Sequence, residues 1–147
     1  SLPQSESVRT TGWPILVTVG QPFVVPMADS IPVEMVFTNV STTNRFSQHN
    51  ADPGYIFVVI EFRVKNLGIR DTYTFPSYHY DLPWELKVDK GYLYRYAEQS
   101  PMVNWIFLRP EETKYSVVAF EILASTKPVE MYIYQPYSKI PRITLRL

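Results

Sequence analysis

Apolar and polar residues alternate over the segment 54–68, near the middle of the chain. Every second residue from Ile56 to Val64 is apolar, whereas Glu61, Arg63 and Lys65 stand on the alternate positions. In a β-strand this repeat of two places the apolar and the charged side chains on opposite faces. We therefore expect a long antiparallel strand at the centre of a sheet, with one buried face and one solvated face.

Shorter runs of the same kind recur along the rest of the chain, separated by turn residues. They predict strands at 15–19, 23–25, 31–39, 72–75, 84–88, 92–96, 113–122, 129–134 and 142–147. The side chains expected to face the core are Val33, Met35, Phe37, Val118, Phe120, Ile122, Ile143, Leu145 and Leu147. Many short strands at regular spacing are typical of a β-sandwich or a barrel.

Three segments between these runs show other patterns. The polar stretch 41–53 has no periodicity and is predicted as a loop. Asp89-Lys90-Gly91 is typical of a hairpin turn, with the glycine at a positive φ. Thirteen prolines leave little room for helix, so we expect at most one helical turn, between Tyr96 and Asn104.

Length, composition and charge narrow the class of protein. A chain of 147 residues suits one domain and buries roughly 70% of the surface that its unfolded form exposes. The 14 basic and 14 acidic residues give no positive field for phosphates, so nucleic-acid binding is not expected. Without cysteine, disulfides and thiolate nucleophiles are excluded. No apolar run reaches the roughly 18 residues of a membrane helix, and membrane contact is expected only through an upstream anchor.

Three motifs follow one another in a fixed order. The first is the strand that starts at Gly54 and ends in Asn66-Leu67-Gly68. The second is an aromatic-leucine strand from Trp84 with the hairpin turn Asp89-Lys90-Gly91. The third is Leu108-Arg109-Pro110-Glu111-Glu112, which leads into a strand that contains a phenylalanine.

In this order, the motifs resemble the telokin-like, immunoglobulin-fold domain of unknown function found in exported proteins and lipoproteins of bacteria and archaea. Related secreted mycobacterial antigens carry the same sandwich. The resemblance covers roughly Val17 to Tyr134. It implies an immunoglobulin-like antiparallel β-sandwich over residues 13–147, with about seven to nine strands and little helix, after a flexible segment 1–12. The chain departs from the family in its aromatic insertion between Gly68 and Trp84 and at Gly20-Gln21, where the family often has Gly-Asp.

Candidate catalytic and metal-binding residues are few. On a strand, His79 and Asp81 would share a face and could bind a metal or orient an imidazole, but a locally hydrogen-bonded loop histidine is the better interpretation. His49 has Asp52 nearby in the polar loop, and a metal site that joins both loops is not expected. Nucleophile motifs and phosphate-binding glycine loops are absent from the sequence. We therefore predict no enzyme, no cofactor and no metal.

Aromatic residues are the main candidates for binding. Tyr92, Tyr94 and Tyr96 alternate, so they would form a stripe on one face of a strand. Exposed rings stack on sugars or anchor protein partners; alternatively, these rings line the core or cover a sheet edge. The candidate ligand-binding residues are Tyr92, Tyr94, Tyr96, Tyr78, Tyr80 and Trp84.

From these observations and the resemblance we expect an extracellular or cell-surface binding or structural module without catalysis. Its expected partner is a protein or a cell-envelope polymer. A carbohydrate-binding accessory domain with an aromatic sheet face is the alternative, and an enzyme with a site near His79 and Asp81 is more distant. Pairing of an open sheet edge with another copy or another domain is a second route to association.

Overall fold

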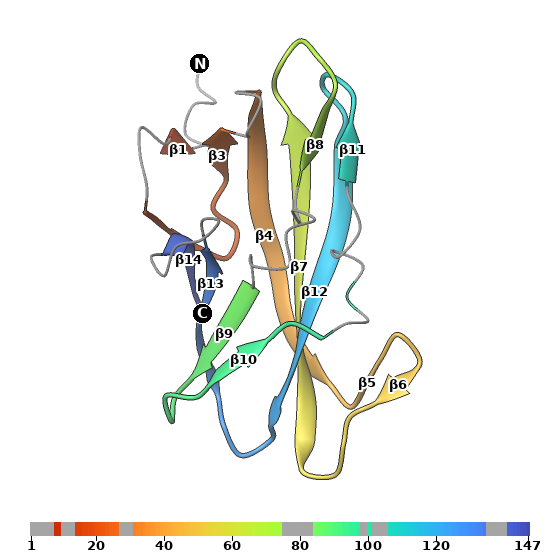
Figure 1. The fold of residues 1–147 in the computed structure, drawn as a ribbon, viewed down its shortest axis with the longest axis vertical. Helices are drawn as coiled ribbons and strands as arrows, with labels where there is room; N and C mark the ends of the chain where they lie inside the picture. The colour runs from red at the N-terminus through yellow and green to blue at the C-terminus, as the bar shows by residue number, and fades with distance from the viewer. Residues whose placement is uncertain are drawn as a thin grey trace.

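In the computed structural model, the chain folds into two main β-sheets that form a sandwich (Figure 1). The structure describes residues 8–9, 14–26, 31–74, 84–97, 100, 106–134 and 141–147. Every helix or strand assigned within these ranges is a β-strand. The expected all-β class is therefore confirmed.

The first sheet is built around the long central strand. Its strands are, in spatial order, β1 (Val8–Arg9), β3 (Phe23–Pro26), β4 (Pro32–Thr43), β7 (Tyr55–Asn66) and β12 (Thr113–Leu123). β1 runs parallel to β3, and the other neighbours are antiparallel. β7 pairs with β12 from Lys65 opposite Thr113 to Tyr55 opposite Leu123, which confirms the long central strand.

The second sheet contains the predicted hairpin. Its strands are, in spatial order, β10 (Leu93–Arg95), β9 (Trp84–Val88), β13 (Pro128–Tyr134), β14 (Pro141–Arg146) and β2 (Ile15–Thr18). Between β9 and β10, the N–H of Gly91 donates to the carbonyl of Val88 at 2.9 Å. Gly91 has φ 89°, a backbone conformation that favours glycine, so the expected turn is confirmed.

The order of the strands is that of an immunoglobulin-like Greek key. The chain crosses between the sheets from β7 to β9, from β10 to β12 and from β12 to β13. These crossings put β12 beside β7 and β13 beside β9. In immunoglobulin terms β4, β7 and β12 occupy the places of strands A, B and E, and β9, β13 and β14 those of C, F and G. The expected immunoglobulin-like sandwich is thus confirmed.

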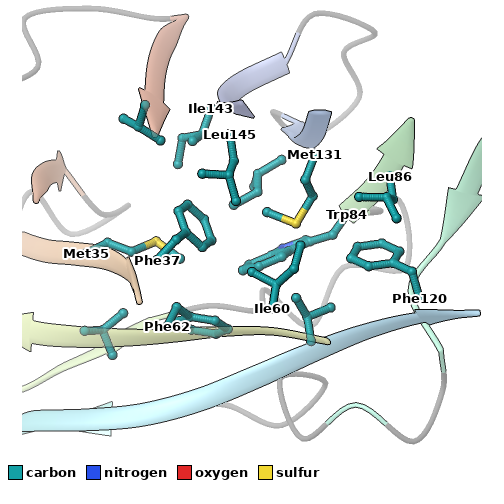
Figure 2. Close-up of a cluster of buried hydrophobic side chains, with 14 of the residues drawn as sticks. Met35, Phe37, Ile60, Phe62, Trp84, Leu86, Phe120, Met131, Ile143 and Leu145 are labelled. Atoms are coloured by element: carbon teal, nitrogen blue, oxygen red, sulfur yellow. The ribbon is translucent and has the colours of Figure 1, made fainter. Parts of the chain in front are cut away.

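Aromatic rings from both sheets fill the core. Figure 2 shows Trp84 of β9 among the side chains of the first sheet. Its ring centroid lies 5.4 Å from that of Phe62 and 6.4 Å from that of Phe37. The expected inward residues of β4, β12 and β14 are buried, except that Leu147 is only partly buried. Because Trp84 starts strand C, it takes the place of the core tryptophan of immunoglobulin domains, here without a disulfide.

The prediction of a loop over 41–53 is wrong. β4 continues to Thr43 past a bulge, and β5 (Arg45–Phe46) and β6 (His49–Asn50) form a hairpin. The Phe46 ring packs against Phe57 of β7, with 5.9 Å between the centroids. Backbone pairing to β7 does not require apolar alternation, which explains why polar residues extend the strand here.

A two-stranded ribbon lies at one end of the long axis, beside β7 and β12 (Figure 1). It consists of β8 (Thr72–Thr74) and β11 (Ile106–Leu108). Thr72, Thr74 and Leu108 are buried, whereas Tyr73 is exposed on the opposite face of β8. With these short elements, the described residues hold more strands than expected. The helical turn expected between 96 and 104 falls mostly outside the described residues.

Candidate binding surface

The predicted tyrosine stripe faces the core along most of its length. Tyr94 and Tyr96 pack against the hydrophobic core, and the hydroxyl of Tyr94 accepts a hydrogen bond from the N–H of Leu123 at 3.4 Å. Only Tyr92, at the hairpin turn, is 52% exposed. The alternation is real, but on this strand it points two of the three rings inward. They therefore do not form a continuous exposed platform.

Trp84 requires a correction as a candidate ligand-binding residue. Its side chain is 1% exposed and lies between the two sheets. A ring in this position stabilises the sandwich and cannot stack on an external ligand. Tyr78 and Tyr80, together with His79 and Asp81, lie outside the described residues, so their assignments stay predictions.

The polar segment offers no metal site in the structure. His49 is exposed on β6. Among the described residues, no group of three or more His, Cys, Asp and Glu side chains could hold a metal ion. Nor does a helix that could cross a membrane occur in the part of the chain that the structure describes.

The outer face of the second sheet carries a different set of aromatic and charged side chains. Inward residues of this sheet, such as Met131 and Leu86, are buried, so their neighbours along the strands point outward. One row of opposed residues across the strands is Leu16, Thr144, Tyr132, Glu85 and Arg95. The next row is Thr18, Arg146, Glu130, Lys87 and Leu93. We call this surface the β13 face.

Two tyrosines at the centre of the β13 face are held by carboxylates. The Tyr132 hydroxyl donates to Glu130 Oε1 at 2.8 Å, and Tyr134 is hydrogen bonded to Glu85. The two rings lie with centroids 6.1 Å apart and planes at 57°. Because each hydroxyl is fixed, the rings present a set geometry to solvent, and a partner would pay little entropy to bind them.

Burial and the neighbouring carboxylates act together on these hydroxyls. Burial, then the hydrogen bond and charge of Glu130, raise the pKa of Tyr132 to about 12. Burial, followed by the same effects of Glu85, raises the pKa of Tyr134 to about 12. Both hydroxyls thus stay protonated as donors at neutral pH. The carboxylates keep acceptor capacity for a partner, since an ionised carboxylate has about four lone-pair sites.

Charges of both signs surround the tyrosine pair. Arg146 Nε lies 4.0 Å from Glu130 Oε2, and Lys87 is opposite Glu130 on the neighbouring strand. Such a surface can hydrogen bond polar groups and stack on apolar ones.

The sequence pattern predicts a strand for Tyr132 and Tyr134 but no binding role. The available signal was the alternation itself, because Glu130, Tyr132 and Tyr134 occupy one parity while Met131 and Ile133 occupy the other. With Met131 and Ile133 recognised as core residues, the outward position of both tyrosines follows.

Comparisons with known proteins support the fold. Neither a family model nor a curated protein matches the chain. A secreted protein of Mycobacterium tuberculosis, MPT63, has a similar structure, with a TM-score of 0.65, 10% identity, and coverage of 93% of this chain and 100% of the other. An uncharacterized β-sandwich protein of Clostridium difficile 630 gives a TM-score of 0.55 at 11% identity, over 94% and 97% of the two chains. At these identities the likeness establishes a shared β-sandwich fold.

Proposed function

We propose that this protein is a non-catalytic binding module of the cell surface or the extracellular space, and that it binds through the β13 face. The observation that carries the proposal is the pair of tyrosines fixed by Glu130 and Glu85 on the outside of the sandwich. Core packing explains the inward side chains of β13 fully, whereas it does not require two aromatic residues on the outward side.

Two further observations support export and binding. A structurally similar protein is a secreted one, which favours an extracellular location. Aromatic and arginine side chains are enriched at the centres of protein interfaces because they bring large contact area and several hydrogen-bond donors. The β13 face combines both kinds, with leucines on its two edge strands.

A protein or a cell-envelope polymer is the proposed partner. The tilt of 57° between the rings of Tyr132 and Tyr134 is unlike the coplanar row that would hold a flat run of sugar rings. A carbohydrate-binding accessory domain therefore stays the second candidate, supported by the polar hydroxyl and carboxylate groups beside the rings.

A binding screen tests the proposal. Wild-type protein is applied to a glycan array, to insoluble cell-wall polymers and to immobilised extracellular proteins. We expect a bound member of this panel to be lost by the double variant Tyr132→Ala/Tyr134→Ala and kept by Tyr115→Ala, which removes a 74% exposed ring from the first sheet. Equal loss in both variants, or no binding by the wild type, would contradict the proposal and favour a structural role.

A further inference from the structure

The turn between β7 and β8, residues 66–71, forms one extreme of the molecule along its longest axis (Figure 1). We call it the Ile69 tip. Ile69 is 92% exposed, which makes it the most exposed large hydrophobic side chain of the described residues, and Leu67 beside it is exposed as well. An apolar side chain that projects this far gains nothing from the rest of the fold.

The chain nevertheless fixes this turn in one shape. The side chain of Asn66 is buried, and its Nδ2 donates to the carbonyls of Arg70 at 2.8 Å and Leu108 at 3.1 Å. Its Oδ1 accepts the N–H of Gly68 at 2.8 Å. One buried amide thus connects both ends of the turn to the ribbon, so the projecting side chain is held in place.

Gly68 allows this close packing. A Cβ added at residue 68 would lie 2.5 Å from Cγ2 of Ile31 and 3.2 Å from Oδ1 of Asn66. Any larger residue would therefore push the turn away from the sandwich. Asn66 and Gly68 thus hold the Ile69 tip in a shape that keeps the side chain of Ile69 in solvent.

Exposed arginines flank the apolar tip, and most of the acidic groups around it have partners. Arg70 follows Ile69, and Arg109 starts the neighbouring turn. Glu111 pairs with Lys65 at 3.5 Å. Glu112 Oε1 accepts the backbone N–H of Arg109 at 2.9 Å. Asp71 is the acidic residue of the tip itself.

An aromatic pair lies one step behind the tip. Tyr73, which is 55% exposed, is opposite Phe107 across the ribbon, with 5.1 Å between the ring centroids. Lys114 Nζ lies 5.9 Å from the centroid of the Phe107 ring. The apolar side chain thus lies at the apex, the arginines beside it and the tyrosine behind them. At a membrane surface, apolar side chains lie deepest, whereas basic and aromatic side chains lie at the level of the headgroups.

We infer that the Ile69 tip inserts into the headgroup region of a phospholipid membrane, with the long axis of the sandwich roughly perpendicular to the membrane plane. The tip is convex, and a lipid surface accepts a projecting isoleucine without a preformed pocket. Guanidinium groups form paired hydrogen bonds with phosphates, so Arg70 and Arg109 suit the layer just above the inserted side chain. This inference is independent of the proposed function, because the β13 face lies on the side of the sandwich and the Ile69 tip lies at its end.

Insertion of one isoleucine gives weak and reversible attachment. The tip therefore orients the domain or adds to another attachment, as single short anchors do. Loss of the isoleucine should reduce partition onto vesicles about 30-fold, because a buried apolar side chain of this size is lost. Loss of both arginines should reduce partition onto anionic vesicles roughly 30-fold.

Flotation with vesicles tests the inference. Phosphatidylcholine vesicles with and without phosphatidylglycerol are mixed with wild-type protein, Ile69→Ser and Val19→Ser. Val19 is the control, since it is 41% exposed but lies in the turn after β2, outside both the Ile69 tip and the β13 face. We expect binding that phosphatidylglycerol strengthens, that Ile69→Ser weakens about 30-fold, and that Val19→Ser leaves unchanged. Absence of wild-type binding, or equal weakening by both variants, would overturn the inference.

A site-specific label gives a second readout. Because the chain has no cysteine, Ile69→Cys or Val19→Cys can carry a single environment-sensitive fluorophore. On phosphatidylglycerol vesicles we expect a blue shift at position 69 and none at position 19. The same shift at both positions, or a shift at 19 alone, would contradict insertion of the tip. Arg70→Gln/Arg109→Gln with unchanged binding would contradict the phosphate contacts.

Discussion

The inner and outer sides of the second sheet use aromatic residues in opposite ways. On the inner side, the Trp84 ring packs against the rings of Phe62 and Phe37. On the outer side, Tyr132 and Tyr134 are held by carboxylates. A sequence rich in aromatic residues therefore does not by itself locate a binding surface. The strand register decides which rings reach solvent.

The largest effect is expected for Trp84→Ala, which tests the inner side. Removal of a fully buried ring between the sheets should lower the free energy of unfolding by about 4 kcal/mol, through lost transfer energy and the cavity left behind. Urea or guanidinium unfolding of the purified variant measures this loss. A loss below about 1 kcal/mol would mean that Trp84 is not part of the core and would reopen its role in binding.

A smaller loss of unfolding free energy is expected for Asn66→Ala. This variant tests a polar side chain that is buried as completely as the aromatic rings of the core. The substitution removes the donors to the carbonyls of Arg70 and Leu108 and the acceptor for the N–H of Gly68. Buried groups without partners should cost about 2–3 kcal/mol of unfolding free energy. Equilibrium unfolding measures it, with Asn39→Ala as the exposed control, since Asn39 bonds Glu61 at the surface. Equal losses in the two variants would contradict an enclosed turn.

High pH tests the outer side, because Tyr132 and Tyr134 titrate near pH 12 in the folded chain and at the ordinary 10.0 when unfolded. A raised pKa means that the folded state holds the proton more tightly. The contribution of these two tyrosines to stability is therefore constant below pH 10 and falls as the pH rises toward 12, by about 1–2 kcal/mol after solvent screening is allowed for.

Denaturant unfolding on both sides of this pH window measures the fall. The variant Tyr132→Phe/Tyr134→Phe should show a shallower decline, and its ultraviolet titration should lack a late phenolate component. An identical pH dependence in wild type and variant would contradict the raised pKa values of these hydroxyls.

The smallest effect is expected for Tyr115→Ala on the outside of the first sheet. Its ring is exposed and lies opposite Arg63 on the neighbouring strand. The free energy of unfolding, measured by thermal unfolding, should change by no more than about 0.5 kcal/mol, as for an ordinary surface substitution. A larger loss would show that the first sheet also depends on its outer aromatic residues.

Much of the fold follows from sequence patterns. Alternation placed β7 correctly, and Asp89-Lys90-Gly91 identified the β9–β10 hairpin because the turn depends only on local backbone conformation. The extension of β4 to Thr43 did not follow, since cross-strand pairing with β7 is a long-range property of the backbone. Sequence patterns over a few neighbouring residues thus predict turns and the faces of strands better than they predict where strands end.

The candidate surface was harder to predict than the fold. Tyr94 and Tyr96 pack against the core, whereas Tyr92 is exposed at the turn, and the inward direction of Tyr94 follows from its pairing with buried Leu86. Tyr132 and Tyr134 are separated by one residue and lie outside the aromatic insertion between Gly68 and Trp84. Only the paired sheet reveals that Glu85, distant in sequence, reaches Tyr134.

The most direct test of the β13 face is to block it with a label. Thr144 lies in the row between Leu16 and Tyr132, and a cysteine there would be the single thiol of the chain. A bulky maleimide on Thr144→Cys should abolish retention of the polymer or protein that wild type binds in the screen, while the same label on Tyr115→Cys should not. Retention unchanged by the label at position 144 would contradict the assignment of the β13 face as the binding surface.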